Sequence, residues 1–139
     1  MMRKRVLLDT GTLVALLKKQ DKFHKWAVGE TATIEKPLLT CEAVIAEACY
    51  LLRNTQGGHE SILKLLNQSS LRIYFQLTSE VENVLELMTR YQSVPMSLAD
   101  ACLVRMAEQL EDSQVFTLDS DFLIYRIKRN QPISIIYPL

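Results

Sequence analysis

Residues 6–12 read VLLDTGT, an uninterrupted apolar run that ends in an aspartate and a turn. A strand of a parallel sheet that is covered on both faces carries a continuous apolar run. A strand with one solvent-exposed face alternates apolar and polar residues instead. The run therefore predicts a buried parallel strand at Val6–Leu8, with Asp9 at its carboxyl end. Apolar residues within 13–17 predict a short helix directly after the turn.

Short apolar runs alternate with helical periods along the rest of the chain. Further strands are expected at residues 37–40, 71–75, 114–117 and 133–137. Helices are expected at residues 24–30, 42–53, 61–66 and 97–111, and another is expected from the capping-box spacing of Ser79 and Glu82. Strands separated by helices predict an α/β fold, with a mostly parallel sheet of about five strands and helices on both faces. The length suits one domain over residues 1–139.

The composition is that of a globular protein without a bulk charge. Hydrophobic residues make up 48% of the chain and charged residues 23%, and sixteen Lys and Arg balance sixteen Asp and Glu. Proteins that hold nucleic acid by bulk positive charge carry a basic excess, which this sequence does not have. A local basic strip around an acidic centre remains compatible with these totals.

The sequence predicts neither export nor a membrane span. Asp9 interrupts the first apolar run after three residues, and no stretch approaches the roughly 20 apolar residues of a membrane helix. The three cysteines, Cys41, Cys49 and Cys102, form no CxxC pair and lie in apolar stretches, which is typical of core residues in a reducing compartment. We therefore expect a cytoplasmic protein.

Five acidic residues are placed where a parallel sheet could gather ligands. Ligands bind outside the carboxyl ends of the strands in such sheets, and Asp9, Asp119 and Asp121 each follow a predicted strand. Glu47 and Asp100 lie in otherwise apolar helical segments, where an unpaired carboxylate is costly and needs a metal, a cation or a helix end. Mg²⁺ prefers oxygen ligands and uses only a few carboxylates. Such an ion activates water and stabilises the leaving oxygen in phosphodiester cleavage.

Each acid also has a purely structural interpretation. Asp9 could cap the first helix, and Asp100 could cap the helix in which it lies. Glu47 could pair with a Lys or Arg of another element, and Asp119 and Asp121 could be turn residues. The order and setting of the acids together favour a shared site more than any one of them does.

The order of the motifs resembles the PIN-domain family, and most closely the small VapC-type toxins. The resemblance covers nearly the whole length and rests on four segments, LLDT at 7–10, VIAE at 44–47, MSLADA at 96–101 and FTLDSDF at 116–122. It implies an α/β/α sandwich around a parallel sheet and a Mg²⁺- or Mn²⁺-dependent endoribonuclease activity. A difference from many relatives is Gly11, which stands where they carry Ser or Asn.

The resemblance also implies roles for individual residues. Asp9, Glu47, Asp100 and Asp119 correspond to acids that hold the metal and help to activate water, Asp121 to a second acid beside the fourth, and Thr117 to a polar neighbour that orients the site. The implied partners are an RNA substrate, an antitoxin protein and a second copy of the chain in a homodimer. Because crowded carboxylates have raised pKa values without a metal, activity is expected to fall at acidic pH.

Other functions fit the sequence less well or remain open. A haloacid-dehalogenase-type phosphatase needs a second aspartate two residues after the first, where this chain has Gly11. A receiver domain needs adjacent early acids and a late lysine, neither of which is evident. A PIN-type nuclease of RNA maturation or decay remains open, and so does a PIN-fold binding module without turnover, although the retained acids count against the latter. The RNA target is not encoded in the acid pattern.

Overall fold

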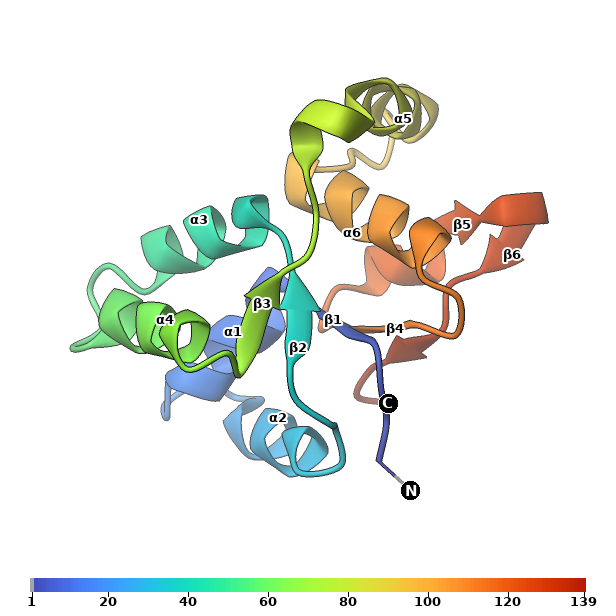
Figure 1. Cartoon of the computed structure of the whole chain (residues 1–139). Coiled ribbons are helices and arrows are strands. Elements are labelled where there is room, and N and C mark those ends of the chain that lie inside the picture. Colours follow the sequence, from blue (N-terminus) through green and yellow to red (C-terminus); the bar gives the residue numbers. More distant parts are fainter. Residues whose placement is uncertain (1) are drawn as a thin grey trace.

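The computed structural model describes residues 2–139, and five short parallel strands form its centre (Figure 1). In spatial order the strands are β3 (Leu71–Ile73), β2 (Leu38–Thr40), β1 (Val6–Leu8), β4 (Gln114–Phe116) and β7 (Ile135–Ile136). All neighbouring strands pair in parallel, with Leu7 of β1 opposite both Leu39 and Val115. The predicted parallel sheet of about five strands is therefore confirmed, with strand ends that differ by at most two residues from the expected ones.

The central strand owes its position to its apolar side chains. Val6, Leu7 and Leu8 are all buried, with an exposed fraction of 1% or less, because elements cover both faces of the sheet. The register then fixes which chain segments meet at the carboxyl edge. The backbone N–H of Asp9 donates to the carbonyl of Phe116, so the segments that follow β1 and β4 lie side by side.

Within residues 2–139, six α-helices flank the sheet (Figure 1). They are α1 (Thr10–Leu17), α2 (His24–Thr31), α3 (Glu42–Leu51), α4 (Gly58–Asn67), α5 (Leu77–Arg90) and α6 (Leu98–Gln109). Helix α3 packs against α1, α4 and α6, whereas α5 packs against α6. The arrangement is the α/β/α sandwich that the sequence pattern and the family resemblance implied.

Two local features differ from the sequence-based expectations. Helix α5 begins at Leu77 rather than at the capping box of Ser79, since the Ser79 hydroxyl donates to the Gln76 side chain instead of capping the helix. After β4 the chain forms a short 3₁₀ helix and a hairpin that was not predicted, and α6 packs against this hairpin. These elements are η1 (Ser120–Leu123), β5 (Arg126–Ile127), η2 (Lys128–Asn130) and β6 (Gln131–Pro132).

Two further expectations concern membranes and cysteines. None of the helices within residues 2–139 combines the length and the apolar character needed to cross a bilayer. Cys41 and Cys102 are buried free thiols and Cys49 is a half-buried one, in agreement with their interpretation as core residues.

Candidate metal centre

Three carboxylates converge at the carboxyl edge of the two central strands. Asp9 follows β1, Asp119 lies three residues beyond the end of β4, and Asp100 lies in the first turn of α6. Each of the three offers one carboxylate oxygen, and these oxygens all lie within 4.8 Å of one another. Asp9 and Asp100 are only 5% and 8% exposed. The fold therefore brings together three of the five acids singled out in the sequence.

Asp9 is held in place by two hydrogen bonds. Its Oδ1 accepts from the backbone N–H of Thr10 at 2.7 Å, which caps α1, and its Oδ2 accepts from the hydroxyl of Thr117 at 2.6 Å. The helix-cap interpretation of Asp9 is thus correct, and it does not exclude a role in a metal site. The Thr117 hydroxyl also accepts from the backbone N–H of Asp119 at 2.9 Å. The buried threonine therefore connects two of the three acids.

Asp100 lies in the capped first turn of α6 and makes a contact that sequence reasoning missed. Its backbone N–H donates to the hydroxyl of Ser97 at 3.0 Å, so Ser97 rather than Asp100 caps this helix. Its Oδ2 accepts a hydrogen bond of 2.7 Å from the hydroxyl of Tyr125. Tyr125 is fully buried and packs edge-on against Tyr91 and Phe122. No local motif marks this tyrosine, because the contact joins residues that are 25 positions apart.

Glu47 and Asp121 border the cluster without joining it. Glu47 lies on the exposed side of α3, and its Oε1 accepts from the hydroxyl of Thr10 at 2.9 Å. The inference that its apolar neighbours bury it is wrong, because Ala46, Tyr50 and Leu51 beside it are exposed as well. Asp121 is half-buried, and its backbone N–H donates to Oδ1 of Asp119, which caps η1.

The electrostatics of the cluster are unfavourable without a cation. Burial raises the pKa of Asp9 from its usual 3.8 to about 7, and the charges of Asp100 and Asp119 add to this rise, while the hydrogen bond from Thr117 opposes it. Burial also raises the pKa of Asp100, with a further contribution from Asp119 and opposition from Tyr125. The pKa of both residues is therefore raised as expected, but burial contributes more to the rise than crowding does.

The donor set fits a hard divalent cation. Three carboxylates supply oxygen ligands, which Mg²⁺ and Mn²⁺ prefer. Within the described part of the chain, none of the ion pairs involves Asp9, Asp100, Asp119 or Glu47. Buried carboxylates need compensation by a positive charge, and no Lys or Arg among residues 2–139 supplies it by an ion pair.

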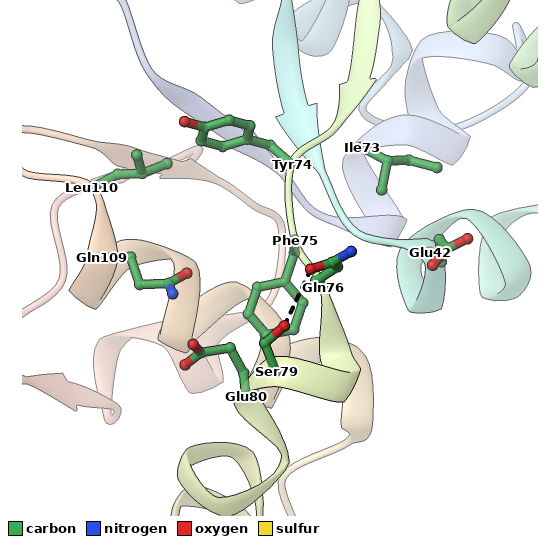
Figure 2. Close-up of a pocket in the computed structure, with 9 residues that line it drawn as sticks. All are labelled: Glu42, Ile73, Tyr74, Phe75, Gln76, Ser79, Glu80, Gln109 and Leu110. Carbon is green, nitrogen blue, oxygen red and sulfur yellow. Dashed lines mark hydrogen bonds between the residues drawn. The ribbon is translucent and has the colours of Figure 1, made fainter.

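The largest of the described cavities lies elsewhere. It has a volume of about 670 Å³ and is formed by the segment between β3 and α5 together with the ends of α3 and α6. In Figure 2, Glu42 lies on the opposite side of this cavity from Gln109 and Leu110. Its second acid, Glu80, is engaged by the guanidinium of Arg105 at 2.6 Å. None of the three converging acids lines it, so its size does not mark the chemical site.

Tyr125→Phe is expected to weaken metal binding while the fold is retained. The change removes the only donor that the structure records on Oδ2 of Asp100 within residues 2–139. Removal of a group that orients a metal ligand typically costs about 10- to 100-fold in metal affinity, so we expect Mn²⁺ to bind about tenfold more weakly. Binding can be measured by electron paramagnetic resonance of free Mn²⁺.

The matched control is Tyr91→Phe, which removes a hydroxyl from the same aromatic group. The Tyr91 hydroxyl accepts a hydrogen bond from the backbone N–H of Arg126. Among the described residues it makes no hydrogen bond to any of the acids. Equal Mn²⁺ affinity in the Tyr125→Phe protein and the control would contradict a positioning role for Tyr125.

Comparisons with known proteins bear on the fold and the family. A family model described as PIN domain matches residues 6–129, a span that includes all five acids. The chain is similar to the crystal structure of Mycobacterium tuberculosis VapC20, which is described as a sarcin-ricin loop cleaving toxin. The two share 19% sequence identity with a TM-score of 0.69, over 84% of this chain and 91% of that one. No curated protein sequence matches the chain significantly.

Proposed function

The chain belongs to the PIN-domain family, and from this premise we propose that it is a metal-dependent endoribonuclease, the toxin of a toxin–antitoxin pair. The observation that carries the proposal is the cluster of Asp9, Asp100 and Asp119, whose oxygens converge without a cationic partner among the described residues. Mg²⁺ or Mn²⁺ bound there would supply Lewis-acid chemistry for the hydrolysis of a phosphodiester bond. The proposed nuclease acts as one domain over residues 1–139, in the cytoplasm.

In this proposal the acidic side chains and Thr117 have separate roles. Asp9, Asp100 and Asp119 hold the ion, and Glu47 and Asp121 complete the set of acids around it. Glu47 lies at the exposed rim and is therefore also accessible to accept a proton from water. The Thr117 hydroxyl orients Asp9 through its 2.6 Å hydrogen bond.

Binding of RNA requires local positive charge, because the net charge of the chain is zero. Arg126, Lys128 and Arg129 of the β5–β6 hairpin line a cavity of about 390 Å³ together with Arg90. Arg126 directly follows Tyr125, whose hydroxyl contacts Asp100. This group of cations supplies local positive charge and supports a path for an RNA backbone.

A homodimer is supported by an apolar stripe on α5. Leu77, Val81 and Leu85 follow one another at intervals of four residues, which places them on one face of the helix, and all three are exposed. Such a stripe suits a self-complementary interface around a two-fold axis.

Leu85→Glu is expected to convert this dimer into a monomer, because the change places a charge in an apolar interface. Sedimentation velocity measures the mass directly. Asn83→Glu is the matched control, since Asn83 is exposed on another face of α5. A mass that is the same for the unmodified protein, Leu85→Glu and the control would contradict an interface at this stripe.

The toxin role is supported by the likeness to VapC20, and a nuclease of RNA maturation or decay is the alternative. The activity is tested with purified protein, total RNA that includes ribosomal and transfer RNA, and added Mg²⁺ or Mn²⁺, with EDTA as the control. Discrete fragments that depend on the ion would support the nuclease. Absence of cleavage would favour a PIN-fold binding module instead. Growth arrest on expression, relieved by a small protein encoded next to it, would separate a toxin from a maturation enzyme.

A further inference from the structure

A third cavity lies on the surface of α3, beside Glu47. It has a volume of about 410 Å³ and is lined by Thr10, Ala46, Glu47, Tyr50 and Leu51. Thr10 directly follows Asp9, donates its backbone N–H to that carboxylate and donates its hydroxyl to Glu47. The cavity therefore shares a wall with the metal centre.

Tyr50 is the aromatic member of this cavity. Its side chain is 62% exposed, so it adds little to the core of the protein. The guanidinium of Arg53 lies 3.9 Å from the centre of the ring, and Nη1 of Arg53 donates to the carbonyl of Tyr50 at 2.8 Å. The arginine is thus fixed over one face of the ring. Tyr50 and Arg53 together form a flat, positively charged platform beside Glu47.

A platform of this kind has a characteristic partner. Unpaired nucleic-acid bases stack on aromatic rings and on guanidinium planes, and this contact does not require a particular base. The charge of Arg53 also attracts a phosphate to a place where the nearby carboxylates would otherwise repel it. An apolar protein segment would gain from Leu51 and Tyr50, but it would gain nothing from the charge of Arg53.

We propose that Tyr50, backed by Arg53, stacks an unpaired base of the RNA next to the phosphodiester bond that is cut. A paired base is not free to reach the platform, so binding of a duplex should not depend on Tyr50. This inference rests on the proposed ribonuclease function and assigns a base-binding residue to the same site.

The experiment uses a single-stranded oligoribonucleotide that contains 2-aminopurine, and a duplex of the same sequence. Binding is followed in EDTA by the quenching of 2-aminopurine fluorescence, and cleavage of the unlabelled strand is followed with Mn²⁺. Tyr50→Leu removes the ring and keeps an apolar side chain, whereas Tyr50→Phe keeps the ring. Tyr74→Leu is the matched control, because Tyr74 is 51% exposed and lines the separate cavity of Figure 2.

Base–aromatic stacking is worth about 1–3 kcal/mol, so Tyr50→Leu is expected to lower single-strand affinity and kcat/KM for cleavage by at least about fivefold. Tyr50→Phe and Tyr74→Leu should keep the affinity, the quenching and the cleavage of the unmodified chain. Unchanged binding and cleavage in Tyr50→Leu would overturn the inference. This outcome would favour a protein partner as the occupant of the cavity. If the unmodified chain cuts no RNA with either ion, the proposed function itself fails. If the unmodified chain and Tyr50→Leu cleave RNA equally well, the stacking inference fails and the proposed function stands.

Discussion

Asp100→Asn is expected to abolish RNA cleavage without unfolding the protein. Asparagine has nearly the same shape, so it can still accept the hydrogen bond from Tyr125 and keep its backbone bond to Ser97. It removes one negative charge from three carboxylates whose oxygens lie within 4.8 Å of one another. The change therefore relieves repulsion in the metal-free protein, and we expect its stability to be equal or greater.

The loss of activity should be large because Asp100 is one of the three converging ligands in the proposed site. Groups that only orient a ligand already contribute about 10- to 100-fold to metal affinity or activity, so loss of a ligand should cost at least about a hundredfold. The measurement compares fragment patterns of total RNA with Mg²⁺ or Mn²⁺ and determines Mn²⁺ affinity in parallel. Asp112→Asn is the control, since Asp112 is an exposed aspartate outside the cluster.

Three outcomes of this comparison would be informative. If Asp100→Asn and the EDTA sample cut as well as the unmodified protein, the activity is a contaminant or the site is assigned to the wrong residues. If Asp100→Asn loses cleavage and Mn²⁺ binding together, the ion and the acid act at one place. Loss of cleavage with unchanged Mn²⁺ binding would contradict Asp100 as a ligand.

The sheet and the converging acids were predictable because both follow from local patterns. The continuous apolar run at Val6–Leu8 specifies a strand buried on both faces, and a parallel sheet places Asp9 and Asp119 at one edge. The spacing of Ser97 and Asp100 specifies a helix start, which the structure contains. These features depend on residues close in sequence and on one topological rule.

The remaining features depend on contacts between distant segments. Tyr125 reaches Asp100 through tertiary packing against Tyr91, and no periodic pattern encodes such a contact. The exposure of Glu47 was misjudged for a related reason. Apolar neighbours along the chain indicate burial only if another element covers that face of the helix, and the exposed Tyr50 shows that this face of α3 is open. Burial is thus a property of the packed fold rather than of the segment.

The metal-free protein is expected to become less stable as the pH rises from about 5 to 8. Asp9 has a pKa of about 7 in the folded protein, against its usual 3.8. Between these values the folded chain holds a proton that the unfolded chain has lost, so the free energy of unfolding falls with rising pH and levels off above about 7. The whole difference corresponds to about 4 kcal/mol, of which about 3 kcal/mol falls between pH 5 and 8, and the raised pKa of Asp100 adds in the same direction.

A divalent ion should reverse this dependence. Metal ligands must be deprotonated, so Mn²⁺ binds more tightly as the pH rises, and an ion that binds only the folded state stabilises it. Urea unfolding between pH 5 and 8 measures how the free energy of unfolding changes with pH, once in EDTA and once in Mn²⁺. Asp9→Asn is the matched variant, since it cannot titrate at this position and should flatten the slope in EDTA. A stability in EDTA that rises from pH 5 to 8, or a slope that Asp9→Asn leaves unchanged, would show that Asp9 is not the group that couples folding to the proton. Activity would then lack the predicted loss at acidic pH as well, because the same carboxylate must lose its proton to hold the ion.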